Sequence, residues 1–423
     1  MSKPKVLIVG GGFGGLYAAR ALKHAPVDVL LVDRTNHHVF QPLLYQVATA
    51  TLSPADICAP IRWLLRHQDN ADVLLADVVA IDTAARVATC ADGKQLPFDF
   101  LILASGARHS YFGHPEWEGI APGLKSVEDA IELRRRWLSA FERADAATSE
   151  DQRTAELTFV VIGGGATGVE LAGMLPTIAQ RALPKDFRHI DTRTARVILL
   201  EGGPRILPAF PEDLSASAEQ ALVELGVEVR TGAIVTNVGD DFVEIGSERI
   251  ESSTIIWAAG NAASPLAAQL GAPIDRAGRV AVNDDLSVPG HPNIFAIGDV
   301  AQLRSDGKPV PGVAPAAMQS GAAAARNIVH TVRGEGRARF HYRNKGDLAT
   351  IGRFRAVGVL AGRHLSGVFA WWTWLLVHIM YLAGFRNRAV VLVQWGYSFF
   401  TYNRGSRLIT GPFVVPKRSR RSS

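Results

Sequence analysis

The chain has 423 residues, about three times the length of a typical single domain, so two or three domains are expected. Apolar residues make up 48% and charged residues 20%, which excludes a disordered chain. A formal net charge of +5 is too small to indicate nucleic-acid binding, so we expect no nucleic-acid partner. The two cysteines, Cys58 and Cys90, exclude a disulfide framework, a cysteine-rich zinc site and a Cys-x-x-Cys redox pair, and we expect no metal site.

The N-terminal segment predicts a dinucleotide-binding unit. A buried strand at residues 6–9, a glycine turn, a helix and a second strand follow in order, and the second strand ends in Asp33. The glycines have the G-x-G-x-x-G spacing: Gly10, Gly12 and Gly15. The first allows a tight turn, the second lets a pyrophosphate approach the backbone, and the third lets the helix pack on the strand, while the acid binds ribose hydroxyls.

The same order of elements returns 153 residues later. A strand at residues 159–162 precedes the second glycine set, and the next strand ends in Glu201. The glycines are Gly163, Gly165 and Gly168. Two nucleotide sites in one chain imply two different dinucleotides, so we expect an α/β fold with two Rossmann-like domains.

Three further apolar strands end in glycine turns. The first two end in Gly106 and Gly260, one for each copy of the pattern. The third ends in Gly298 and Asp299. Together with the paired glycine sets, these turns resemble the flavoproteins that have two dinucleotide-binding domains.

The resemblance implies FAD on the first glycine set and NAD(P)H on the second, inserted one. The residues implied for FAD are Gly10, Gly12, Gly15, Asp33, Gln46, Gly106 and Asp299. Those implied for the nicotinamide cofactor are Gly163, Gly165, Gly168, Glu201 and Gly260. The carboxylate of Glu201 favours NADH, because it repels the 2′-phosphate of NADPH, although Arg205 nearby offsets part of that repulsion.

Longer motifs resemble the type II NADH dehydrogenases, and this resemblance covers essentially the whole chain. They are Asn36–Thr49, Gly168–Gly173, Ala314–Gly321 and Phe340–Arg353. The resemblance implies a single-subunit enzyme that passes a hydride from NADH to FAD, and then two electrons to a membrane quinone, without pumping protons. Cys58 and Cys90 fit neither a disulfide reductase nor a sulfide-oxidising relative.

Two residues are implied as catalytic by these motifs. Glu170 matches a glutamate that helps to place NADH and assists proton delivery to quinone, and Gln319 matches a glutamine near the quinone side of the flavin. Position 315, where relatives often carry another glutamine, is proline here. His37 and His38 are either catalytic or loop residues without a role.

The C-terminal segment is expected to face a membrane. Residues 367–385 carry no formal charge and many aromatics, a second aromatic run covers 390–402, and the tail 417–423 is basic. Because the aromatics are spread along the segment rather than gathered at its ends, a pair of interfacial helices is favoured over a membrane span. The alternative is that these helices cover the nucleotide domains or a second copy in a homodimer.

The predicted organisation has four parts: an FAD domain in two pieces (1–115 and 290–340), an inserted NADH domain (116–289) and a C-terminal membrane-association segment (341–423). The expected location is the cytoplasmic face of the inner (plasma) membrane, with peripheral attachment. Two rivals remain open: a soluble NAD(P)H-dependent reductase of a ferredoxin-like or small-molecule acceptor, and a flavoprotein that binds NADH without turnover.

Overall fold

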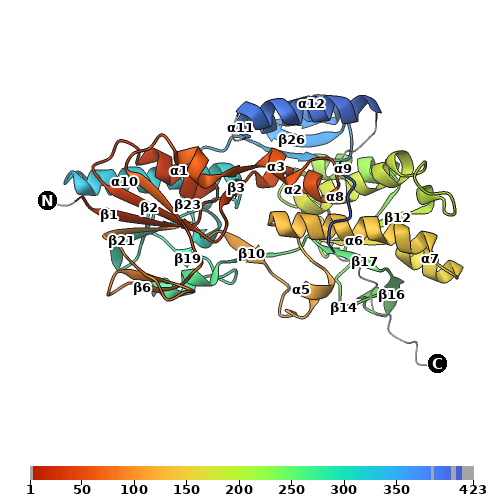
Figure 1. The fold of residues 1–423 in the computed structure, drawn as a ribbon, viewed down its shortest axis with the longest axis horizontal. Coiled ribbons are helices and arrows are strands. Elements are labelled where there is room, and N and C mark those ends of the chain that lie inside the picture. The colour runs from red at the N-terminus through yellow and green to blue at the C-terminus, as the bar shows by residue number, and fades with distance from the viewer. Residues whose placement is uncertain (1–2, 383–384, 402–405, 412–423) are drawn as a thin grey trace. The chain divides into compact units, whose positions relative to one another are not determined.

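A computed structural model describes residues 3–382, 385–401 and 406–411 of the chain (Figure 1). The chain forms two compact units, each assembled from separate stretches of sequence. Unit 1 comprises Met1–Val39, Cys58–Arg108 and Asn261–Lys345. Unit 2 comprises Phe40–Ile57, His109–Gly260 and Gly346–Ser423. The borders predicted from the sequence divide the chain by the cofactor that each part is expected to bind, whereas these units are defined by compactness. The predicted borders therefore stay a prediction.

Unit 1 is built on a six-stranded sheet of order β20-β21-β9-β1-β2-β5. Its strands are β1 (Lys5–Val9), β2 (Asp28–Asp33), β5 (Ala71–Leu75), β9 (Phe100–Leu103), β20 (Ser287–Val288) and β21 (His291–Ala296). All neighbours pair in parallel except β20 and β21. The strands are apolar nearly throughout because both faces of the sheet are covered.

Two helices with small residues cover one face of this sheet. They are α1 (Phe13–Ala21) and α10 (Ala314–Val332), and the small sheet of β6 (Val78–Asp82), β7 (Val87–Cys90) and β8 (Gln95–Pro97) lies toward the other face (Figure 1). A β-carbon on Gly321 would lie 2.2 Å from the carbonyl oxygen of Gly14, so the two helices touch backbone to backbone.

Unit 2 repeats the arrangement with a four-stranded sheet of order β13-β12-β11-β17. Its parallel strands are β11 (Thr158–Ile162), β12 (Arg196–Leu200), β13 (Val227–Arg230) and β17 (Thr254–Trp257). The helices around it are α6 (Val127–Asp145), α7 (Glu150–Glu156), α8 (Ala166–Thr177) and α9 (Glu212–Glu224), and a hairpin sheet of β14 (Asn237–Gly239), β15 (Phe242–Ile245) and β16 (Glu248–Glu251) follows. The two parallel sheets confirm the predicted α/β fold. Between α8 and β12 the chain continues as a π-helical turn at Ile178–Ala182.

The C-terminal part of unit 2 forms a third layer. A three-stranded antiparallel sheet of β25 (Asp347–Thr350), β26 (Ala356–Leu360) and β27 (Arg363–Ser366) lies between α11 (Gly367–Tyr381) on one face and α8 and α9 on the other (Figure 1). The helix α12 (Phe385–Thr401) packs beside α11, and the short helices α2 (Leu44–Ala48) and α3 (Pro54–Ile57) also belong to this unit. Within the described ranges, no helix is both long and apolar enough to cross a bilayer. The basic run 417–423 lies outside the described residues.

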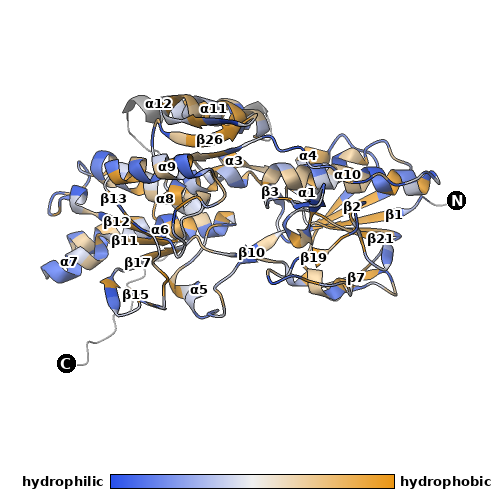
Figure 2. Cartoon of the chain, turned by 180° about the vertical axis from the view of Figure 1, so that it is seen from behind, coloured by the Kyte–Doolittle hydropathy of each residue, from blue (hydrophilic) through white to orange (hydrophobic). Residues whose placement is uncertain are grey.

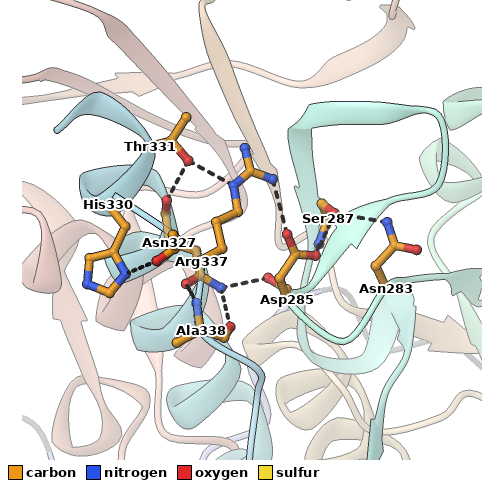
Figure 3. Close-up of polar contacts among 9 residues, drawn as sticks. Asn283, Asp285, Ser287, Asn327, His330, Thr331, Arg337 and Ala338 are labelled. Carbon is orange, nitrogen blue, oxygen red and sulfur yellow. Dashed lines mark hydrogen bonds and ion pairs between the residues drawn. The ribbon is translucent and has the colours of Figure 1, made fainter. Parts of the chain in front are cut away.

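A polar cluster fastens the end of α10 to the turn before β20 (Figure 3). The side-chain amide of Asn327 donates to the carbonyl oxygens of Asp285 and Ala338 and accepts from the N–H of Ala338, at 2.9 Å each. Arg337 donates to the Asp285 carboxylate at 3.1 Å. Although burial opposes the shift, the bonds from Ser287, and after them this ion pair, hold the pKa of Asp285 below its usual range. These bonds therefore join α10 to the edge of the unit 1 sheet.

Candidate functional site: two dinucleotide cradles and the Glu170 network

The first glycine turn sits at the carboxyl end of β1 and has the geometry that a pyrophosphate site requires. Gly10 has φ +109°, and a β-carbon there would lie 2.3 Å from the carbonyl oxygen of Ala104. A β-carbon on Gly15 would lie 1.8 Å from the carbonyl oxygen of Gly10, so this glycine lets α1 pack on β1. Gly12 lies at the N-terminus of α1. A β-carbon built on it would have no heavy atom within 4 Å, so its backbone is open to a ligand.

The second turn reproduces this geometry in unit 2. Gly163 has φ +110° with its β-carbon position 2.7 Å from the Ala258 carbonyl carbon, and the Gly168 position lies 1.9 Å from the Gly163 carbonyl oxygen. Gly165 caps α8 and, like its counterpart in unit 1, has open space around it. The two cradles therefore have one tight turn, one open backbone position and one close helix contact each.

In each unit, the acid at the end of the second strand binds the backbone of the glycine turn. Asp33 accepts from the backbone N–H of Gly11 at 2.5 Å and from Thr35. Glu201 accepts from the N–H groups of Gly164 and Gly203, at 2.6 Å each. Each carboxylate is thus fixed beside the open backbone position, and its remaining lone pairs can accept ribose hydroxyls.

Arg205 is committed to its own loop. Its guanidinium donates to the carbonyl oxygens of Phe210 at 2.8 Å and of Pro208 at 3.1 Å. These bonds hold two of its nitrogen atoms, so fewer N–H donors remain to bind a 2′-phosphate.

The remaining strand-to-glycine turns lie at the same sheet edges. In unit 1, Gly106 (φ +65°) follows β9, and Asp299 follows β21 behind Gly298 (φ +64°). In unit 2, Gly260 (φ +72°) follows β17, and a β-carbon built on it would lie 2.6 Å from the ring of Phe112. Parallel strands bring all these turns to the carboxyl edge of their own sheet, where ligands of open α/β sheets bind.

His38 supports the first cradle, a role that the sequence left undecided. Its Nδ1 lies 3.1 Å from the carbonyl oxygen of Gly11, and its ring meets Phe13 edge-on at 4.9 Å. Burial lowers the pKa of His38 to about 4, so the ring is neutral at physiological pH and Nδ1 donates to the carbonyl. Cys90 is also buried, and burial raises the pKa of its thiol, which makes a reactive role unfavourable.

Glu170 lies in the second turn of α8, one helix turn before Gly173. A β-carbon on Gly173 would lie 2.6 Å from the backbone nitrogen of Gly352, so α8 touches the end of β25 directly. The backbone N–H of Thr350 donates to the Glu170 carboxyl, but desolvation is the larger effect and raises the pKa of Glu170 to about 8. At neutral pH this carboxyl holds its proton.

A buried hydrogen-bonded chain, here called the Glu170 network, leads from Thr350 to α12. The hydroxyls of Thr350 and Tyr45 lie 3.0 Å apart, Gln46 Nε2 donates to the Tyr45 oxygen at 3.0 Å, and Trp395 Nε1 donates to Gln46 Oε1 at 2.7 Å. The structure thus brings Gln46 and Glu170 into one network. No periodicity in the sequence marks Thr350 or Trp395 as members.

Gln319 lies in unit 1, on α10, and is engaged with the backbone. Its Nε2 donates to the carbonyl oxygen of Arg343 and its Oε1 accepts from the N–H of the same residue, at 2.9 Å each. The amide thereby clamps the chain that leaves unit 1. Among the residues described, no group of three or more His, Cys, Asp or Glu side chains could hold a metal ion.

Comparison with known proteins places this architecture. The signature of the pyridine nucleotide-disulphide oxidoreductase family matches residues 4–321. Two type II NADH:quinone oxidoreductases of Mycobacterium tuberculosis are 45% and 44% identical, over 98% and 96% of this chain and 91% and 90% of their own lengths. A solved NDH2 from Plasmodium falciparum in complex with NADH has the same fold, with a TM-score of 0.86 at 21% identity, covering 98% of this chain and all of that one. The chain therefore belongs to the type II NADH:quinone oxidoreductases.

Proposed function

We propose that the chain oxidises NADH at the unit 2 cradle and reduces a membrane quinone, with FAD held at the unit 1 cradle. The observation that carries the proposal is the duplication of the cradle: in each unit, an open glycine at the N-terminus of a helix lies beside a fixed carboxylate. When bound, FAD supplies the redox chemistry, because it accepts a hydride and passes on two electrons.

The residues of unit 1 fit FAD. The backbone at Gly12 can bind the pyrophosphate at the positive end of α1, and Asp33 can bind the ribose of the adenosine half. Asp299 lies beside Gly312, whose β-carbon position is 3.3 Å from the carboxylate, and is proposed to bind the ribityl and pyrophosphate region. A β-carbon built on Gly106 would have no heavy atom within 4 Å, which leaves room for the same ligand.

The residues of unit 2 fit NADH better than NADPH. Gly165 is the open backbone position, and Glu201 can accept two ribose hydroxyls but repels a phosphate. Arg205 is bonded to its own loop, which supports the same preference.

Glu170 is proposed to hold and deliver a proton during quinone reduction. A carboxyl that keeps its proton near pH 7 can donate it to an anionic oxygen and take another from solvent afterwards. Quinone reduction requires two electrons and two protons, so a neutral acid beside the reaction path lowers the cost of the charge that develops.

The quinone headgroup is proposed to bind beside Trp374 on α11. Within the part of the chain that the structure describes, the indole N–H of Trp374 is buried and has no hydrogen-bond partner. A buried donor without an acceptor is unfavourable, and a quinone carbonyl is an acceptor. The ring stacks on His378 at 4.2 Å, and burial lowers the pKa of His378 to about 4, so the imidazole beside Trp374 is neutral at physiological pH.

The membrane is proposed to contact the outer face of α11 and α12, which we call the apolar outer face. Its exposed residues are Val368, Phe369, Trp372, Leu376 and Met380 on α11, and Leu392, Val393 and Tyr397 on α12. Figure 2 shows these helices and β26 as a largely hydrophobic layer. An exposed apolar face of this kind marks an interface. We propose that it attaches the protein peripherally to the cytoplasmic face of the inner (plasma) membrane. The alternative is that a second copy of the chain covers this face.

The deciding experiment is anaerobic stopped-flow absorbance of the detergent-purified protein with its flavin. NADH is mixed first and a short-chain quinone second. We expect bleaching of the flavin band by NADH and rapid recovery with quinone. Bleaching without recovery would assign a different electron acceptor, such as a soluble ferredoxin-like protein, and no bleaching would leave only a binding function.

A further inference from the structure

The side-chain amide of Gln46 joins α12 to the strand that contacts Glu170. Gln46 is 5% exposed and lies on α2, between Tyr45 and Trp395. An indole nitrogen can only donate, so Trp395 fixes the orientation of the amide with Oε1 toward the indole. Nε2 must then face Tyr45.

This orientation gives the Glu170 network a single direction. Gln46 donates to the Tyr45 oxygen, so the phenolic hydrogen can be donated onward to Thr350 Oγ1 at 3.0 Å. The backbone N–H of Thr350 donates in turn to the Glu170 carboxyl. Each donor therefore points from α12 toward Glu170, and the bonds from Gln46 and Tyr45 can strengthen one another. The last step runs through the position of Thr350, because its hydroxyl and its backbone N–H are separate groups.

The position of Trp395 depends in turn on how α12 is seated. Residues 387, 391 and 395 are buried and recur every fourth position, while Leu392, Val393 and Tyr397 are exposed on the apolar outer face. One side of the helix thus carries the indole, and the other carries the face proposed to meet lipid.

We infer that Gln46 is a positioning residue for the Glu170 carboxyl, held by Trp395 of α12 and acting through Tyr45 and Thr350. The inference rests on the proposed role of Glu170 and adds a route by which α12 supports it. It also reassigns Gln46, which the sequence suggested as a cofactor contact, to a side chain whose carbonyl and one amide hydrogen are taken up by protein.

The chain offers a matched control on the same short helix. Trp137 of α6 donates its indole N–H to the carbonyl oxygen of Ala48 at 2.7 Å and is also buried. Trp137→Phe removes one indole donor from α2, as Trp395→Phe does, but leaves the Glu170 network intact. A merely structural role for the network would make the two substitutions equivalent.

The test measures both half-reactions of the full-length flavin-loaded protein by anaerobic stopped flow. Tyr45→Phe and Trp395→Phe are made alone and together with Glu170→Gln. We expect each single variant to slow the half-reaction that Glu170→Gln slows, by about tenfold, which corresponds to one net hydrogen bond. In the Glu170→Gln background neither should slow it further, and Trp137→Phe should leave both rates within about twofold of wild type.

A pair of variants at Thr350 keeps the inference testable if Tyr45→Phe loses its flavin. Thr350→Ser retains the hydroxyl and should react as wild type does, whereas Thr350→Val should match Tyr45→Phe. Equal losses in both backgrounds, or an equal loss in Trp137→Phe, would overturn the inference while leaving the function in place. Wild-type rates in Glu170→Gln would overturn the role of Glu170 and the inference together, and a wild type that NADH does not reduce would overturn the function itself.

Discussion

The carbonyl oxygen of Gly10 lies 1.8 Å from the point where a β-carbon on Gly15 would stand, and Gly163 and Gly168 repeat the relationship at 1.9 Å. No side chain fits at either position, because both neighbours are backbone and cannot swing aside. The two copies share this contact but are proposed to hold different ligands, so matched substitutions separate the two sites.

Gly15→Ala should yield protein that loses FAD, whereas Gly168→Ala should keep FAD and raise the KM for NADH at least tenfold. The clash forces the helix away from the strand, at a cost of roughly 2–4 kcal/mol, and so moves the open backbone position. Flavin content and steady-state kinetics measure the two effects. Gly12→Ala is the control. The added methyl group contacts no protein atom, so it should not cause a large fall in Tm, but it fills the space proposed for FAD and should cause loss of FAD. Loss of FAD in Gly168→Ala as well would argue against separate sites.

Glu201→Gln should raise the ratio of kcat/KM for NADPH to that for NADH by about tenfold or more. The amide keeps an acceptor oxygen for one of the N–H groups of Gly164 and Gly203, but it no longer repels a 2′-phosphate and binds the ribose less well. Asp33→Asn is the matched change in the other cradle, and it should leave this ratio unchanged. An unaltered ratio in Glu201→Gln would show that the ribose lies elsewhere.

The cradles could be predicted from sequence because every part is local. The roles of Gly10, Gly12 and Gly15 follow from spacing alone, and the structure confirms the tight turn, the open position and the close helix contact. The bond from Trp395 to Gln46 joins residues 349 positions apart, and no periodicity shows that an indole and an amide will meet. Gln319 illustrates the same limit, since its motif says nothing of the backbone of Arg343 that occupies its amide.

The elevated pKa of Glu170 predicts a specific dependence of stability on pH. Its folded pKa of about 8 lies above the ordinary glutamate value of 4.5. The unfolded chain therefore releases its proton first, and stability falls as the pH rises from 4.5 to 8. His38 and His378 act in the opposite direction: their pKa values fall from 6.5 to about 4, so their contribution to stability is lost as the pH falls from 6.5 to 4. Between pH 6.5 and 8, stability therefore changes with the titration of Glu170 and not with that of either histidine.

Glu170→Gln should remove the decline in Tm between pH 6.5 and 8 that we expect of the wild type. The same variant should lack the loss of quinone-reductase rate that we expect of the wild type above about pH 8, where the carboxyl no longer holds its proton. Thermal unfolding and pH–rate profiles are the measurements. A parallel decline of Tm in both proteins would assign the titration to another group.

Asn327→Ala should lower the stability of unit 1 by roughly 2–4 kcal/mol, because it removes three hydrogen bonds at a side chain that is 1% exposed (Figure 3). The carbonyl oxygens of Asp285 and Ala338 and the N–H of Ala338 lose this partner. Asn283→Ala removes a single bond to Ser287 at the edge of the same cluster and should cost less than about 1 kcal/mol. Thermal unfolding of the flavin-loaded protein compares them, and equal shifts would contradict the central place given to Asn327.

Membrane attachment is better tested by point substitution than by deletion of the C-terminal segment. Removal of the chain from residue 364 onward would take away most of β27 and both helices, and would uncover the apolar face of the sheet on which α11 packs. Loss of lipid binding in such a truncation would not be separable from unfolding of the layer.

Phe369→Glu should weaken binding to anionic lipid vesicles more than tenfold while leaving Tm and NADH-driven dye reduction unchanged. Phe369 is 83% exposed, so the fold does not depend on it, yet insertion of a phenylalanine side chain into an apolar phase is worth about 1.5–3 kcal/mol, and a carboxylate is repelled by anionic headgroups. Val223→Glu is the control, because Val223 is a 57% exposed apolar residue on α9, away from the apolar outer face. Vesicle flotation measures both variants. Equal binding of the two would remove α11 from the membrane contact, and a shift from dimer to monomer in Phe369→Glu would assign the apolar outer face to a second copy of the chain instead.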